Sequence, residues 1–306
     1  MHTKTIAVSA CLALIASFEA SGAFVTYEAG QVYKVTSPVV AEEIRLDGEL
    51  RIKPGGTVIG TITEGDGHLV VDGGTLVGGT FWWNGTTTVK SGTVTGQLTG
   101  YASHGNMLVP DIAISGGSVL GGISVDNQFV EISGGYVGNK VEWIFADFAM
   151  TDGVVDGRLW SDAAWNVSIS GGLVTGSMYL GDYNETGGDR SITGGTFTGT
   201  NLPGDTPLLS LYTSLNIFGG SFATNTFLIG EFGQLNIFGT GFSYTDGILS
   251  GLLRDGSQFS QRIVLENGGK LNIVDVPEPS TLGLFGISLL GLALGSRGRA
   301  SQAARL

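Results

Sequence analysis

The chain has 306 residues, of which 52 are glycine, 14% are charged and 42% are hydrophobic. So much glycine is unusual for a globular α/β enzyme, and the many regularly placed Val, Ile and Leu residues argue against a disordered chain. Residues 24–275 contain 11 Lys or Arg and 25 Asp or Glu, a net charge of −14. We therefore expect no nucleic-acid partner, because an acidic surface repels phosphate groups.

The N-terminal segment has the three parts of a secretory signal. Lys4 precedes an apolar run at residues 6–18, and the small residues Ser-Gly-Ala follow and end at Ala23. We expect residues 1–23 to be a signal peptide that signal peptidase removes after Ala23. The only cysteine, Cys11, lies in this leader. The mature protein would therefore have neither disulfides nor cysteine metal ligands.

The body is built from copies of one short motif, Ser-Gly-Gly-Leu-Val-Thr-Gly at residues 170–176. We take the second residue of each Gly-Gly pair as the mark of its repeat. The marks are Gly56, Gly74, Gly92, Gly117, Gly135, Gly153, Gly172, Gly195, Gly220, Thr240 in a degenerate copy, and Gly269. Their spacing has a minimum of 18 residues, with occasional additions. This pattern indicates one structural turn per repeat, with loops inserted in some turns.

Apolar residues lie three and five positions before most marks and two positions after nearly all of them, as Val71, Leu69 and Leu76 do around Gly74. Alternation with period two predicts strands with one apolar face. The Gly-Gly pair interrupts this period, so it must turn a corner, and glycine permits the positive φ that a corner needs. We predict an all-β fold: a single-stranded parallel β-helix, or solenoid, of 10–11 coils, which we expect to be right-handed.

The solenoid is expected to fill residues 24–275 as one domain. Residues 24–47 should form the N-terminal cap and the first strands, and residues 241–260 should contribute the C-terminal cap. Insertions are expected near residues 101–110 and 179–188, where the spacing between marks increases.

The C-terminal segment, residues 276–306, differs in composition from the body. Val276-Pro277-Glu278-Pro279 precedes an apolar run at residues 282–294, and Arg297 and Arg299 follow. A helix of this run reaches about 20 Å, short of the hydrocarbon thickness of about 30 Å, so we expect a marginal transmembrane helix. The arginines would hold its end in the cytoplasm.

These three parts, in this order, resemble the PEP-CTERM sorting tail of exported proteins from Gram-negative bacteria that make extracellular polysaccharide. The resemblance covers residues 276–306. It implies recognition by an exosortase-type membrane enzyme, processing near Pro277 to Pro279, and delivery to the cell surface or extracellular matrix. It also implies contact with the membrane through residues 282–294 before processing, and it leaves open whether the tail is retained as an anchor or removed.

Polysaccharide lyases and hydrolases use the β-helix scaffold, so a catalytic site has to be considered. Such a site needs carboxylates that converge from the same register of neighbouring coils. The densest polar group is Asp152, Asp156, Arg158 and Asp162, but the equivalent positions of neighbouring repeats are not acidic. We therefore expect no catalytic residue, no cofactor and no metal site.

Three tryptophans are candidates for carbohydrate contact. Trp82 and Trp143 lie eight residues after their marks, and Trp160 lies seven after its own. An exposed row could stack on sugar rings, although burial is the more common fate of tryptophan. We expect an exported, non-catalytic surface or matrix protein that contacts exopolysaccharide or other cells. The alternative is a polysaccharide lyase or glycoside hydrolase on the same scaffold.

Overall fold

The computed structural model describes residues 3–4, 24–82, 84–101, 110–181, 188–200 and 206–276. All regular structure in these residues is β, and no helix occurs among them. The all-β prediction is therefore confirmed for this part of the chain. The expected helix at residues 282–294 and most of the leader lie outside the described residues. Within the described ranges, no helix is long and apolar enough to cross a membrane.

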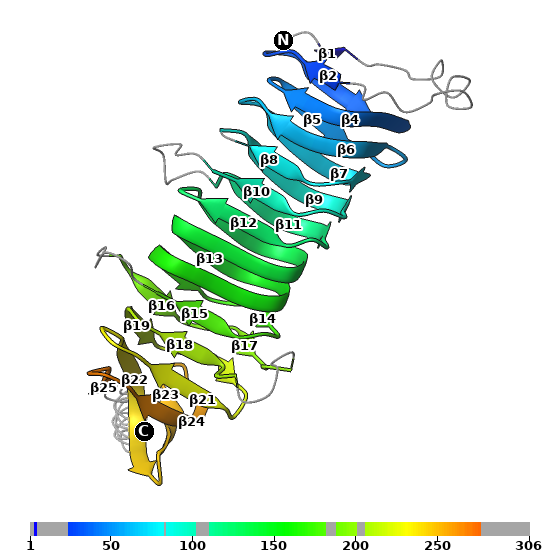
Figure 1. The fold of residues 1–306 in the computed structure, drawn as a ribbon. Helices are drawn as coiled ribbons and strands as arrows, with labels where there is room; N and C mark the ends of the chain where they lie inside the picture. The colour runs from blue at the N-terminus through cyan, green and yellow to red at the C-terminus, as the bar shows by residue number, and fades with distance from the viewer. Residues whose placement is uncertain are drawn as a thin grey trace, which may run out of the picture.

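The described strands form one connected, mixed sheet of 25 strands, stacked along a long axis from the N-terminal to the C-terminal end (Figure 1). Most pairings are parallel, and they follow three ladders, which we name A, B and C.

Ladder A contains β3 (Val32–Val35), β5 (Glu49–Ile52), the starts of β7 (His68–Val77), β9 (Thr86–Val94) and β11 (Ile112–Val119), segments of β13 (Val130–Ile169), β16 (Arg190–Ile192), β19 (Ser214–Ile217), β22 (Gln234–Thr245) and β25 (Lys270–Asp275). The short β1 (Thr3–Lys4) pairs with β3. Ladder B contains the starts of β4 (Pro38–Leu46) and β6 (Thr57–Glu64), the ends of β7, β9 and β11, part of β13, β14 (Leu173–Val174), β17 (Thr196–Phe197) and β20 (Ser221–Phe222).

Ladder C contains β2 (Phe24–Tyr27), the ends of β4 and β6, β8 (Thr80–Trp82), β10 (Leu98–Gly100), β12 (Ile123–Asp126), part of β13, β15 (Met178–Leu180), β18 (Leu209–Leu211), β21 (Thr226–Ile229) and β24 (Gln258–Leu265). The remaining strand, β23 (Ile248–Leu253), pairs antiparallel with β22 and β24.

The register of the ladders follows the repeat marks. Leu50 pairs with Leu69, and Leu69 pairs with Thr87 of the following repeat. These positions, together with those two residues after the mark such as Leu76, are buried in one continuous core. The apolar pattern predicted from the sequence therefore marks the inward side chains of the stack.

The Gly-Gly corners behave as predicted. Gly153 has a φ of 93°, and a Cβ at this position would lie 2.8 Å from the backbone of Gly134 in the preceding repeat. Because a real Cβ contact of this length does not occur, the corner can approach the preceding rung so closely only with glycine at position 153.

The last repeat differs from the prediction. Leu235 and Ile237 pair with Leu271 and Ile273, so the final strand lies 36 residues after its partner. Gly269, which was taken as the last mark, precedes this strand instead of following it, and the prediction of a corner there is wrong. The extra length is a hairpin inserted after Gly239, in which β22 and β23 pair antiparallel.

This hairpin fills the region where a C-terminal cap was expected. The strand β23 also pairs antiparallel with β24, which itself pairs in parallel with β21. β23 pairs with residues 258–262 of β24, so it meets the ladder C part of that strand, residues 262–265, only at Arg262. Figure 1 shows the hairpin projecting at the C-terminal end of the stack.

Candidate functional site

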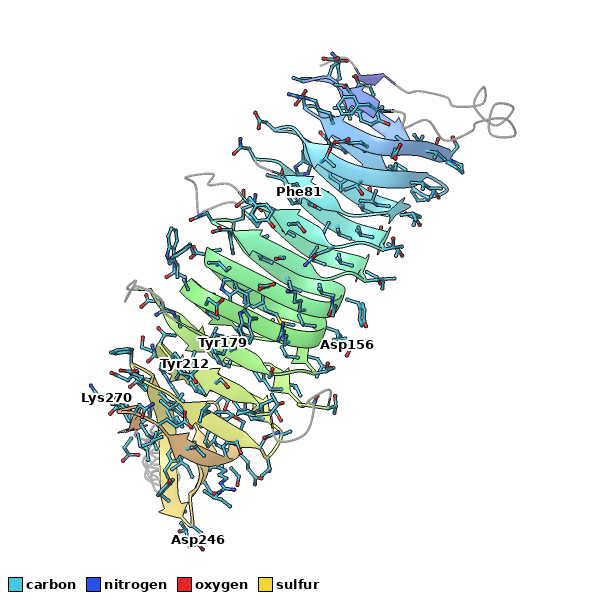
Figure 2. The ribbon with its side chains drawn as sticks, viewed as in Figure 1. Phe81, Asp156, Tyr179, Tyr212, Asp246 and Lys270 are labelled. Atoms are coloured by element: carbon cyan, nitrogen blue, oxygen red, sulfur yellow. The ribbon has the colours of Figure 1, made fainter. Side chains whose placement is uncertain are left out.

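The outward side of ladder C carries a group of aromatic side chains. Thr80 and Leu159 are buried, so the alternation of the strand turns the next residues, Phe81 and Trp160, outward. Trp160 pairs in register with Tyr179 of the next rung. We call Phe81, Tyr101, Trp160, Tyr179 and Tyr212 the aromatic face; Figure 2 labels three of its members, Phe81, Tyr179 and Tyr212.

Three rings of this face form a stack along the axis. The ring centroids of Trp160 and Tyr179 are 4.1 Å apart with planes inclined by 12°, and those of Tyr179 and Tyr212 are 5.5 Å apart at 39°. The guanidinium of Arg158 lies 4.8 Å from the centroid of the Trp160 ring. All three rings are half-buried. The rings cover one another's faces, so they offer a ligand mainly ring edges and the tyrosine hydroxyls.

A second aromatic pair is more open. The rings of Phe81 and Tyr101 are 5.2 Å apart, inclined by 54°, and are 44% and 42% exposed. Sequence reasoning missed this pair. The signal was present: Phe81, Trp160 and Tyr179 all lie seven residues after a repeat mark. Side chains at that position point outward in ladder C.

The three predicted tryptophans do not form one row. Trp143 is fully buried, and its ring stacks on Phe148 with centroids 4.6 Å apart. It lies in the core and cannot touch a polysaccharide on the folded surface, so it is removed from the candidate contacts. Trp143 stands eight residues after its mark and Trp160 seven, and one residue of register reverses the side on which a strand residue points. The side chain of Trp82 lies outside the described residues.

The acidic group around Asp156 is engaged in local structure. The Tyr136 hydroxyl donates to Asp156 Oδ2 at 2.8 Å, and Thr175 Oγ1 donates to Oδ1 at 2.8 Å, so the carboxylate connects three rungs. This hydrogen bond raises the pKa of Tyr136, because its deprotonation would set two negative charges side by side. The Asp152 carboxylate accepts the N–H of Gly153 at 2.7 Å, within its own corner.

Histidine and metal chemistry find little support in the described ranges. His68 Nδ1 lies 2.6 Å from Thr86 Oγ1, and Nε2 lies 3.3 Å from Thr88 Oγ1. Burial is the main cause that lowers the pKa of His68. Among the described residues, no group of three or more His, Cys, Asp or Glu side chains could hold a metal ion.

The folded body continues to the first residue of the tail. β25 ends at Asp275, and the N–H of Val276 donates to the carbonyl of Gly239 at 3.0 Å. Ala23 and the predicted sorting residues Pro277, Glu278, Pro279, Arg297 and Arg299 lie outside the described residues.

Residues 275–299 match the family described as the PEP-CTERM protein-sorting motif. The chain carries a PEP-CTERM sorting tail. This tail implies export, recognition by an exosortase-type sorting enzyme and association of the C-terminal segment with a membrane. No curated protein and no solved structure matches the chain. The PEP-CTERM motif directly follows β25, so the sorting signal leaves the stack at its C-terminal end.

Proposed function

We propose that the protein is an exported, non-catalytic component of the cell surface or extracellular matrix of a Gram-negative bacterium. A signal peptide, residues 1–23, would start its export, and residues 282–294 would hold the tail in the membrane until an exosortase-type enzyme processes it near Pro277 to Pro279. The observation that carries the proposal is the PEP-CTERM motif at residues 275–299, which follows a body of stacked repeats along the chain.

We interpret the body as a right-handed parallel β-helix of 10–11 coils. Support comes from parallel partners one repeat apart, from three ladders that share one core, and from corners at the Gly-Gly pairs. Such a body presents long side faces, which suit repeated weak contacts with an extended polymer.

The aromatic face is our candidate for contact with exopolysaccharide. The open pair of Phe81 and Tyr101 would pack against sugar rings, and the Trp160 to Tyr212 stack would add edges and hydroxyl groups. Contact with other cells through the same faces is the second form of the proposal.

A lyase or hydrolase receives less support. Asp156 is held by Tyr136 and Thr175, and Asp152 by its own corner. Catalytic carboxylates have to face a shared space in which the substrate lies. An incubation of the purified protein with acidic polysaccharides tests this alternative, since released reducing or unsaturated sugar ends would establish an enzyme.

Sorting is tested with the full chain in a bacterium that has an exosortase-type enzyme. We expect surface or extracellular delivery and a C-terminus near residues 277–279 by mass spectrometry. A variant with Pro277→Ala and Pro279→Ala should keep its tail and remain in the cell membrane. If the unaltered chain stays in the cytoplasm with residues 1–23 still attached, the proposal is wrong.

Polysaccharide contact is tested by retardation in gels that contain exopolysaccharide of the producing bacterium. Phe81→Ser combined with Tyr101→Ser should reduce retardation several-fold. Val40→Ser is the matched control, because Val40 is an exposed apolar residue of ladder B. Equal retardation of both variants would remove the aromatic face from the proposal.

A further inference from the structure

The C-terminal end of the stack leaves apolar core positions uncovered. Ile229 and Ile237 are fully buried, yet their register partners in the last rung, Leu265 and Ile273, are 50% and 45% exposed. No described strand pairs with the outer edge of β25. Two core columns therefore end in exposed side chains, whereas Ile263, the register partner of Phe227, is only 5% exposed.

Further exposed apolar side chains belong to the last strands and to the hairpin. Ile248 and Leu252 of the hairpin and Val274 of β25 are exposed. With Phe232, Leu265 and Ile273 they make up what we call the apolar end. Exposed apolar residues that gather at one end of a fold mark an interaction site more often than residues scattered singly do.

Phe232 adds an independent observation. It is the most exposed large apolar residue of the described chain, at 71%, and its φ is 65°. The left-handed region costs a bulky residue roughly 1–2 kcal/mol, which a glycine would avoid. Phe232 is the third residue of the turn that the Gly233 N–H closes on the Gly230 carbonyl, and this turn directs its ring out into solvent.

The geometry points to a lipid surface as the partner of the apolar end: we infer that the protein stands on the membrane by this end while the tail is attached. The tail is membrane-associated, and only residues 277–281 separate Val276 from the apolar run at residues 282–294. Five extended residues reach at most about 18 Å. The apolar end is therefore held at the bilayer surface, where apolar and aromatic side chains enter the interface.

The distribution of charge agrees with this orientation. Residues 24–225 contain 8 basic and 20 acidic residues, whereas residues 226–276 contain 3 and 5. The net charge is −12 over 202 residues and −2 over 51 residues, so the end next to the tail is about one third less acidic per residue and is repelled less by anionic lipids.

A second copy has only part of this end for strand pairing. The hairpin covers β24 up to Ile263, through the antiparallel pairs of residues 258–262 and the hydrogen bond from the Ile263 N–H to the Gly247 carbonyl. Val264 and Leu265 of β24 and the edge of β25 are left for such pairing among the described strands. Docking of a second copy is therefore an outcome that the experiment has to separate from contact with lipid.

The experiment uses the full chain, inserted through its tail into phosphatidylcholine vesicles that contain a fraction of phosphatidylglycerol. Ile273→Cys, in a Cys11→Ser background, carries an environment-sensitive dye. The matched control is Val40→Cys, which is also exposed and belongs to β4, a strand near the other end of the stack (Figure 1). We expect blue-shifted emission and several-fold stronger quenching by spin-labelled lipids at position 273 than at position 40.

Phe232→Ser should weaken the quenching at position 273 while circular dichroism of the strands stays unchanged. Equal and weak quenching at both positions would overturn the inference. Blue-shifted emission without quenching by lipid would also overturn it, because the tail or a second copy would then cover the apolar end. The inference rests on the membrane-associated tail and not on polysaccharide contact, so its failure leaves the gel-retardation result unaffected.

Discussion

The ring of Tyr179 lies nearly parallel to the ring of Trp160, with centroids 4.1 Å apart, so each ring covers one face of the other. A sugar ring that packs on an aromatic residue needs a free face. The main role of the stack is therefore to hold three rungs together, and its contact with a ligand is secondary. The open pair of Phe81 and Tyr101 is better suited to ligand contact than to holding rungs together.

Removing the middle ring of this stack should destabilise the body. Tyr179→Ala deletes contacts with both Trp160 and Tyr212, and we expect a loss of about 1–3 kcal/mol in the free energy of unfolding. Urea denaturation followed by tryptophan fluorescence measures it. Tyr244→Ala, at an exposed residue of the hairpin, is the control and should cost little. A Tyr179 variant as stable as the control would show that the stack contributes nothing.

The close approach of neighbouring corners predicts a large cost for a single methyl group. A Cβ at Gly157 would lie 1.3 Å from the carbonyl oxygen of Asn139, so Gly157→Ala requires the backbone to move. We expect a loss of about 3 kcal/mol or more. Gly241→Ala is the control, because its φ is 65° but no atom lies within 4 Å of the added Cβ. It should cost about 1 kcal/mol, from backbone strain alone. Similar thermal midpoints for the two variants would contradict the stacked geometry.

Asp255 fastens the hairpin to the stack. Its Oδ2 accepts the N–H of Gly220 at 2.9 Å, and its Oδ1 accepts the N–H of Ser257 at 2.9 Å. Burial raises the pKa of Asp255, but hydrogen bonds from Ser257 and Gly220 outweigh it and leave the pKa below its ordinary value.

The sign of the pH effect follows from this lowered pKa. The stabilisation is present above the unfolded value of 3.8 and is lost as the pH falls through the folded value. The thermal midpoint of the unaltered protein should therefore drop between pH 5 and pH 3 by more than that of Asp255→Asn. The difference should be small, because Asp255 is largely exposed. Parallel pH curves for the two proteins would refute this role.

His68 predicts a second, separate pH effect. Burial lowers its pKa below 6.5, so the unfolded chain takes up the proton first on acidification. The neutral imidazole makes its full contribution to the free energy of unfolding above pH 6.5, and this contribution is lost as the pH falls toward the folded pKa. His68→Gln should lack this decline in hydrogen exchange or thermal scans between pH 7.5 and pH 5. A decline of the same size in the variant would assign it to other groups.

Much of the fold could be read from the sequence, because a stack of repeats converts a local pattern into a global one. The apolar residues around each mark, such as Leu69 and Val71, proved to be inward, since an identical environment recurs in every rung. The sorting tail could also be predicted from the sequence, since it is defined by short motifs at residues 276–299 and does not depend on the fold of the body.

Only the tertiary structure decided which tryptophan is buried, where the last rung lies and what its end exposes. Trp143 stands eight residues after its mark and Trp160 seven, and the strand pairing and burial show that the first register points inward and the second outward. Gly269 looked like a corner because the hairpin at residues 240–260 interrupts the repeat, but residues 271–273 repeat the Leu-Asn-Ile of residues 235–237, and strand pairing confirms that the ladder resumes there. Ile273 has the same local pattern as the buried Ile237, but it lacks a following rung, and burial depends on that neighbour.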